Sequence, residues 1–153
     1  MWFWQVMRDN LEILILSATP VIELRGAIPV GLAQGMSLPA AFALAYAGSL
    51  LPSLPILYLY TMVSRWMQNH PPADRIVIWV NERLLRRQDS IDRWGLLALF
   101  IFVAIPLPGT GVWSASGIAA LLHMPKRTAF VAIALGNLTA GLIITAVSFP
   151  LWR

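Results

Sequence analysis

The sequence predicts an all-α polytopic membrane protein built from an inverted repeat, in which each half contributes a re-entrant helical hairpin and a transmembrane helix. The composition is 58% hydrophobic and only 12% charged, whereas soluble domains carry about 25% charged residues. Two long apolar segments are broken by proline and glycine, and the breaks recur at a fixed separation. Paired, interrupted apolar segments in the two halves of a chain are typical of inverted-repeat membrane folds.

Prolines and glycines punctuate both halves of the chain at a common offset of 86 residues. The matching pairs are Pro20 with Pro106, Gly31 with Gly117, and Pro39 with Pro125. Further along, the offset grows by two residues, so that Phe42 and Gly48-Ser49 fall on Phe130 and Gly136-Asn137. We therefore expect one membrane domain over residues 1–153, with repeat 1 over about 11–63, a linker over 64–93 and repeat 2 over about 94–149.

The first half pairs a broken apolar segment with an unbroken one. The broken segment covers residues 11–35 and contains Pro20 and several glycines. An acid and a base, Glu23 and Arg25, stand inside this otherwise apolar run. Residues 38–63 follow without a charged residue. They are long enough to cross a bilayer, because a crossing helix needs about 20 residues.

The second half repeats this order, with a broken segment over residues 94–122 and a spanning segment over residues 129–149. Each broken segment is either one kinked transmembrane helix or a re-entrant hairpin that enters and leaves on the same side. We favour the hairpin, because the Pro-Leu-Pro-Gly-Thr-Gly run at 106–111 removes two backbone donors and supplies flexible glycines. Irregular backbone at membrane depth needs cover from protein or from a watery cavity.

Residues 64–93 form the polar centre of the chain and carry most of its arginines. Apolar residues between Ile76 and Leu84 gather on one side, which predicts an amphipathic linker helix on the cytoplasmic membrane surface, its arginines facing anionic lipid. A solvated charged loop is the alternative. The positive-inside rule places this segment in the cytoplasm of a multi-pass protein of the inner (plasma) membrane. Charge counting does not choose between hairpins, with both termini outside, and four spans, with both termini inside.

Glu23 and Arg25 are the first candidate site residues. A charge near mid-bilayer costs about 2.5–3.5 kcal/mol on insertion scales, so such residues face a cavity or a partner. Positions two apart on a helix do not face each other, so either the backbone is not helical there or each charge has its own partner. One interpretation is a buried ion pair that closes the hairpin. The other is a Glu23 that exchanges protons beside an Arg25 that binds an anion, with Gly26 next to them.

The segment Pro108-Gly109-Thr110-Gly111 is the second candidate. Bare amides at the N-terminus of a half-helix, together with the Thr110 hydroxyl, can hold an anionic group. A tight turn that needs glycine for its conformation alone is the alternative. Trp113 either lines the cavity or packs, and Asn137 is either a polar cavity group or an interhelical hydrogen-bonding residue. Gly48, Gly136 and Gly141 are expected to allow close helix packing.

Several classes of function lack the residues that they need. The chain has no cysteine, so it has no disulfide, thiolate metal site or cysteine nucleophile. His70 and His123 lack a second ligand at metal spacing, and no Ser-His-Asp arrangement or P-loop occurs. No basic and aromatic groove pattern suggests nucleic-acid binding. We expect no enzyme activity, no cofactor, no metal and no nucleic-acid partner.

The segments Glu23-Leu24-Arg25-Gly26-Ala27-Ile28-Pro29 and Pro106-Leu107-Pro108-Gly109-Thr110-Gly111-Val112-Trp113 resemble the signatures of the small multidrug export protein family. This resemblance covers residues 11–149. A more distant similarity is to the DedA superfamily, whose members carry two facing re-entrant hairpins, and it implies lipid-carrier recycling, proton coupling and drug tolerance. The chain departs from the DedA pattern at Thr110, where that pattern places an acid, and at the Glu-x-Arg pair, where it has a longer acidic motif.

These observations together predict a small, homodimeric, proton-coupled transporter that exports an anionic or amphipathic small molecule. Its site would lie between the two hairpins, where Arg25 and the amides of residues 109–111 hold the substrate and Glu23 exchanges protons. Membrane lipid would surround it, and Gly136 and Gly141 would contribute to the dimer contact. One alternative is a flippase for an anionic lipid carrier such as a polyprenyl phosphate. A non-transporting membrane scaffold is the other.

Overall fold

The computed structural model describes residues 2–59, 88–107 and 109–148, with side chains for residues 7–59, 94–107 and 109–148. These residues are helical apart from short turns, and no strand occurs among them. The predicted all-helical class is therefore confirmed for the described part of the chain. In order, the helices are α1 (Trp2–Ala18), α2 (Glu23–Ala33), α3 (Leu38–Leu50), α6 (Gln88–Ala104), α7 (Val112–Leu121) and α8 (Lys126–Ser148).

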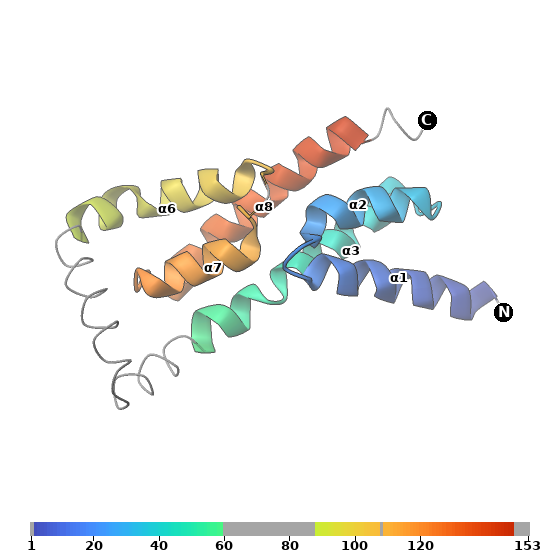
Figure 1. Cartoon of the computed structure of the whole chain (residues 1–153), viewed down its shortest axis with the longest axis horizontal. Coiled ribbons are helices and arrows are strands. Elements are labelled where there is room, and N and C mark those ends of the chain that lie inside the picture. The colour runs from blue at the N-terminus through green and yellow to red at the C-terminus, as the bar shows by residue number, and fades with distance from the viewer. Residues whose placement is uncertain (1, 60–87, 108, 149–153) are drawn as a thin grey trace.

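Two helical hairpins, α1–α2 and α6–α7, point their turns at each other in the middle of the molecule (Figure 1). The first turn covers residues 19–22, and the described residues of the second turn are 105–107 and 109–111. The long helices α3 and α8 run alongside the hairpins. In Figure 1, the start of α1 and the C-terminal end of α8 lie on the right, and the start of α6 lies at the far left. The broken segments predicted from the prolines are thus helix–turn–helix units.

Helices α2 and α7 both end in a Schellman motif, in which the residue after the C-cap adopts the left-handed backbone conformation. That residue is Gly35, with φ 81°, in the first half and His123, with φ 53°, in the second. The following amide, of Met36 or Met124, donates to a carbonyl in the last turn at 3.0 Å in both halves. The two halves therefore build matching helix ends 88 residues apart, although only one of them uses glycine.

The structural match between the halves has two offsets. Helices α1 and α6 end at Ala18 and Ala104, which keeps the offset of 86 residues found for the prolines. At the far ends of α2 and α7 the offset is 88, because Gly35 lies 17 residues after Ala18 whereas His123 lies 19 residues after Ala104. Gly31 therefore corresponds to Ala119 in the Schellman motifs. The predicted equivalence of Gly31 with Gly117 is wrong for this reason.

Glycines bring each long helix against the first helix of its own hairpin. A Cβ at Gly48 on α3 would overlap the Ser17 hydroxyl and the Leu14 carbonyl of α1. A Cβ at Gly136 on α8 would lie 2.7 Å from the Phe100 carbonyl oxygen of α6. These contacts confirm that the glycines serve close helix packing.

Gly141 packs in the same manner, because a Cβ there would lie 2.9 Å from Phe42 Cε2 and 3.1 Å from Leu24 Cδ1. Gly136 and Gly141 are both buried against helices of their own chain. The expectation that these two glycines contribute to a dimer contact is therefore wrong, because the space beside them is already filled.

The buried apolar residues form two clusters. Ile13 and Leu24 belong to a cluster within α1, α2 and α3, and Val103 belongs to a cluster around α6, α7 and α8. All three side chains are fully buried. Leu57 of the first half belongs to the second cluster and Ile144 of α8 packs against the first, so the two halves also bury apolar surface against each other.

Among the described residues, two helices are long and apolar enough to cross a membrane, namely Leu38–Leu59 and Lys126–Ser148. The first contains α3, a turn at residues 51–52 and a further helical stretch to Leu59. Beyond the first turn of α8, the exposed side chains of both helices are largely apolar, as lipid contact requires, and include Leu54, Leu59, Leu135, Leu142 and Val147. The predicted spans are thus present, with α8 starting three residues earlier than expected.

The predicted amphipathic linker over residues 64–93 lies largely outside the described residues. Its last part is an exception, because α6 begins at Gln88. The first helix of the second broken segment therefore begins six residues before Trp94, the predicted start of that segment.

Gly48→Ala is expected to destabilise the protein, because the new Cβ would overlap the Ser17 hydroxyl and the Leu14 carbonyl. Overpacking of this kind costs about 1–3 kcal/mol of unfolding free energy. The matched control is Gly117→Ala, since a Cβ there meets no heavy atom within 4 Å, and alanine is about 0.5–1 kcal/mol better than glycine inside a helix. Thermal denaturation in detergent measures both variants. Equal midpoints for the two would contradict the packing described for Gly48.

Candidate functional site

The carboxylate of Glu23 lies at the N-terminus of α7, in the opposite hairpin. The Trp113 backbone amide donates to Glu23 Oε1 at 3.4 Å, and the Val112 amide also faces the carboxylate. Glu23 is only 6% exposed. A negative charge is favourable at this end of a helix because the first amides have no intrahelical partner and the helix dipole is positive there.

Glu23 replaces the capping side chain that α7 lacks. The N-cap of α7 is Gly111, which has no side chain to accept hydrogen bonds. A Cβ built on Gly111 would fall on the Glu23 carboxylate. Ser or Asp at an N-cap accepts a hydrogen bond from the amide two or three residues later, and Trp113 is that second residue. The first hairpin therefore caps a helix of the second one, and this arrangement requires glycine at 111.

The backbone of Glu23 is unusual for a residue other than glycine. Its φ is 48°, in the left-handed region, which few residues other than glycine adopt. Such conformations cost about 1–3 kcal/mol and persist where the surroundings hold them, often at functional sites. In this conformation the Glu23 side chain contacts the N-terminus of α7, and this contact offsets the cost of the backbone conformation.

The guanidinium of Arg25 caps the opposite kind of helix end, the C-terminus of α6. Arg25 Nη2 lies within hydrogen-bonding distance of three carbonyl oxygens, that of Thr110 at 2.9 Å and those of Val103 and Ile105 at 3.4 Å. Arg25 Nη1 donates to the Leu107 carbonyl. Cationic side chains are favourable here because the last carbonyls of a helix are unpaired and the dipole is negative at this end.

Thr110 holds the second turn together. Its hydroxyl donates to the Ile105 carbonyl at 2.7 Å and accepts from the Leu107 amide at 3.3 Å. Arg25 Nη2 also lies 3.1 Å from Thr110 Oγ1. The sequence predicts that Thr110 helps to hold an anionic group, whereas the charged group that its hydroxyl oxygen contacts in this structure is the cationic guanidinium of Arg25.

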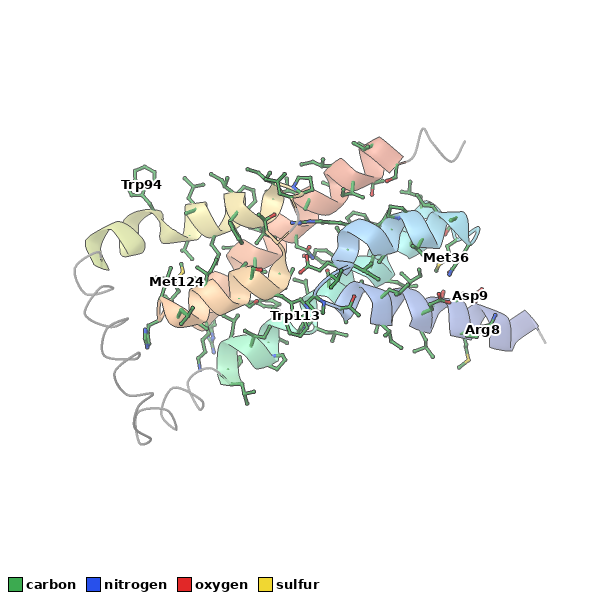
Figure 2. The ribbon with its side chains drawn as sticks, in the orientation of Figure 1. Arg8, Asp9, Met36, Trp94, Trp113 and Met124 are labelled. Carbon is green, nitrogen blue, oxygen red and sulfur yellow. The ribbon has the colours of Figure 1, made fainter. Side chains whose placement is uncertain are left out.

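Trp113 of the second hairpin contacts the C-terminal end of α1 in the first hairpin, as Arg25 of the first hairpin contacts that of α6. Its indole Nε1 donates to the Ala18 carbonyl at the end of α1, at 3.0 Å, and Figure 2 labels it where the two hairpins meet. Trp113 stands 88 residues after Arg25, the structural offset between α7 and α2. Equivalent positions in the two halves therefore cap the first helix of the opposite hairpin.

Glu23 and Arg25 do not form a close ion pair with each other. Among the described side chains, the salt bridge is between Arg8 and Asp9 at 3.8 Å. Glu23 and Arg25 interact electrostatically at longer range. Each charge has its own helix end as a partner. The prediction that charges two residues apart have separate partners therefore describes this pair.

The remaining candidates lie apart from these contacts or serve the turns. Gly26 packs against its own turn, since a Cβ there would lie 2.6 Å from Ile22 Cγ2. Gly109 is an exposed turn residue with φ 85°. Pro108 lies outside the described residues. Asn137 is buried on α8 and its Nδ2 donates to Ser49 Oγ on α3 at 2.7 Å, so the interhelical alternative describes its contact.

The carbonyl groups that accept hydrogen bonds from Arg25 and Trp113 could not be identified from the sequence. Every residue has a carbonyl, so nothing in the sequence distinguishes those of Ala18, Val103, Ile105 and Leu107. Ser49 did have a signal, because Gly48-Ser49 matched Gly136-Asn137 between the halves. In the structure these equivalent polar residues meet each other.

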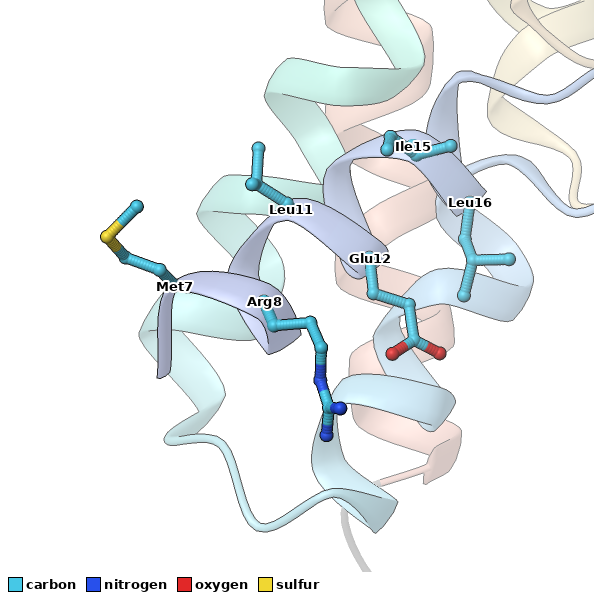
Figure 3. Close-up of a pocket in the computed structure, with 6 residues that line it drawn as sticks. All are labelled: Met7, Arg8, Leu11, Glu12, Ile15 and Leu16. Atoms are coloured by element: carbon cyan, nitrogen blue, oxygen red, sulfur yellow. The ribbon is translucent and has the colours of Figure 1, made fainter. Parts of the chain in front are cut away.

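Two surface grooves lie away from the junction of the turns. One, of about 490 Å³, lies along α1, where Arg8 and Glu12 point to the same side (Figure 3). The other, of about 470 Å³, lies between α6 and α8 and is apolar except near Arg127 and Thr128. Within the described residues, no three His, Asp or Glu side chains gather closely enough to hold a metal ion.

The described residues include two apolar helices of spanning length, as a membrane protein requires. Residues 23–143 match the family described as "Putative small multi-drug export protein". The chain belongs to this family, which confirms the resemblance seen in its two signature segments. No curated protein and no solved structure gave a match to the chain.

Moving the capping group from Glu23 to position 111 is expected to restore stability. Glu23→Ala removes the carboxylate from α7, and Gly111→Asp alone places a second carboxylate against it. Loss of a cap costs about 0.5–2 kcal/mol of unfolding free energy. The double variant Glu23→Ala/Gly111→Asp should be more stable than the sum of the two single changes predicts. Denaturation of all four proteins measures this coupling, and strictly additive effects would show that Glu23 does not cap α7.

Proposed function

We propose that this protein is a proton-coupled exporter of an anionic, amphipathic small molecule, with its site where the two hairpin turns meet. Family membership supports export through a membrane protein. The proposal rests on the position of the Glu23 carboxylate at the backbone amides that begin α7. A helix N-terminus binds anions, so the place that the carboxylate occupies also suits the anionic group of a substrate.

The proposal includes re-entrant hairpins related by an inverted repeat. Helix α7 has 10 residues, which at 1.5 Å per residue span about half of the roughly 30 Å hydrocarbon thickness. Lys126 Nζ lies 4.5 Å from the centre of the Tyr58 ring, so α8 starts beside the end of the first span. A hairpin between these points returns the chain to the same side, whereas one kinked spanning helix would place Lys126 on the opposite side.

Proton coupling follows from competition for the N-terminus of α7. A substrate anion that binds the amides of Val112 and Trp113 has to displace the Glu23 carboxylate. Protonation of Glu23 removes the charge that holds it there. The anion and the proton are then bound in the same conformation and move in the same direction. An outward substrate gradient drives export, and acid on the loading side accelerates it.

A flippase for an anionic lipid is the second candidate function. The groove between α6 and α8 favours it, because apolar Leu96, Phe100 and Leu135 line it and Arg127 offers a positive charge. Acyl or prenyl chains suit the apolar wall and a phosphate suits the arginine. Movement of a polyprenyl phosphate between leaflets, without flux of soluble anions, would select this function over the first.

Glu23→Gln is expected to abolish the response of transport to a pH gradient while leaving folded protein in the membrane. In proteoliposomes that report efflux of carboxyfluorescein, a cationic dye and a labelled polyprenyl phosphate, the ratio of the flux at acid pH to the flux at neutral pH should fall about tenfold or more. Like protonated Glu23, the glutamine has no charge to hold it at α7, so the variant should transport at neutral pH as the wild type does in acid. A partly buried charge at a helix end is worth up to about 2 kcal/mol, and 1.4 kcal/mol is tenfold. Glu12→Gln, on the exposed side of α1, is the matched control.

An unchanged ratio of acid to neutral flux from well-folded Glu23→Gln protein would exclude Glu23 as the proton-exchanging group. Parallel loss of abundance and of every activity would instead indicate the scaffold interpretation, in which Glu23 only holds the hairpins together.

The hairpins predict which side of the membrane each position faces. The chain lacks cysteine, so single cysteines at Arg8 and Lys126 can be labelled selectively in cells. A membrane-impermeant thiol reagent should label Arg8→Cys from outside and should label Lys126→Cys only after the cells are opened. External labelling of Lys126→Cys combined with protection of Arg8→Cys would require kinked spanning helices.

A further inference from the structure

Five oxygen atoms converge on the guanidinium of Arg25 at the α6–α7 turn. Four of them surround one nitrogen, Nη2: the carbonyl oxygens of Thr110 at 2.9 Å and of Val103 and Ile105 at 3.4 Å, and Thr110 Oγ1 at 3.1 Å. The fifth, the Leu107 carbonyl, accepts from Nη1. We call this set the oxygen cage. A guanidinium NH₂ group has two hydrogens, so the cage presents more acceptors than this nitrogen can satisfy.

The oxygen cage is organised by the second hairpin itself. Thr110 Oγ1 lies 2.7 Å from the Ile105 carbonyl oxygen and 2.9 Å from the Leu107 carbonyl oxygen, so its single O–H donates to one of the two. The Thr110 amide donates to the Leu107 carbonyl at 3.2 Å. Arg25 belongs to the other hairpin and lies 82 residues from Leu107 in the sequence. The oxygens therefore keep their arrangement through bonds that do not involve Arg25.

We propose that the oxygen cage is a binding site for a monovalent cation and that Arg25 is its tethered occupant in this conformation. When the two turns separate, Arg25 leaves with the first hairpin, and an alkali cation or the ammonium group of an organic molecule takes its place. Backbone carbonyls at the unwound C-terminal end of a helix coordinate monovalent cations in membrane proteins and replace their hydration shell.

The chemistry of the oxygen cage selects charge and ligand class. Its members are carbonyl and hydroxyl oxygens, without a carboxylate, whereas sites for Ca²⁺ and Mg²⁺ rely on carboxylates. The negative end of the α6 dipole adds an attraction for positive charge. Arg25 therefore marks the position of a cation, just as Glu23 marks that of an anion at α7. This inference goes beyond the proposed function, because it depends on the turn alone and not on transport.

Chemical rescue tests the oxygen cage in the full-length protein. Arg25→Ala in detergent should melt below the wild type, and millimolar guanidinium, methylammonium, K⁺ or Na⁺ chloride is then added at ionic strength balanced with choline chloride. We expect methylammonium or an alkali cation to raise the melting temperature of Arg25→Ala by about 3 °C or more relative to choline, a readily measured shift for a chain of this size. Rescue by methylammonium alone assigns the site to organic ammonium groups, and rescue by K⁺ or Na⁺ assigns it to an inorganic ion.

Arg127→Ala is the matched control, because Arg127 is exposed and does not contact the oxygen cage. It should respond to every chloride salt as it does to choline. Arg25→Gln, which keeps a shorter neutral donor, gives the same test if the alanine variant does not fold. Rescue by guanidinium alone would overturn the proposal, because the cage would then be only a cap for the arginine. An equal response of the Arg25 and Arg127 variants to all salts would overturn it as well.

Discussion

The structure depends on the way in which helix ends are satisfied in its interior. Each helix leaves amides unpaired at its N-terminus and carbonyls unpaired at its C-terminus, and hydrocarbon offers these groups no hydrogen-bonding partner. Hairpin turns at the centre of the molecule bring such ends together. Glu23, Arg25 and Trp113 each reach into the opposite hairpin to satisfy one of them. The two halves are therefore joined through backbone groups as well as through packed side chains.

This arrangement explains how an acid and a base two residues apart can both lie in an apolar segment. Each charge interacts with a helix end of opposite sign, so neither depends on a close ion pair. The same arrangement constrains its neighbours. Gly111 has to lack a side chain because the Glu23 carboxylate fills that space, and Glu23 adopts left-handed backbone where glycine would be easier. A change at one of these positions is expected to affect the others, because they share one small volume.

The contacts between the long helices follow a related pattern. Ser49 meets Asn137, and Tyr46 donates to the Ala134 carbonyl, and each pair is separated by 88 residues. Equivalent positions of the two halves thus face each other. In the proposed inverted repeat, contacts between equivalent positions lie near the axis that relates the halves. Separation of the hairpin turns would then expose one helix N-terminus and one helix C-terminus together, which gives the junction places for both an anion and a cation.

The sequence by itself determined the helical membrane class, the two broken segments and their turns near Pro20 and Pro106, and the importance of Glu23 and Arg25. These features follow from composition, from the conformational effects of proline and glycine, and from the cost of burying charge. Only the tertiary structure decided what those charges contact. Their partners are backbone carbonyls and amides on the other hairpin, 82 residues away for Arg25 and Leu107 and 90 for Glu23 and Trp113. Every residue carries such groups, so the sequence does not distinguish the ones that the fold brings into contact.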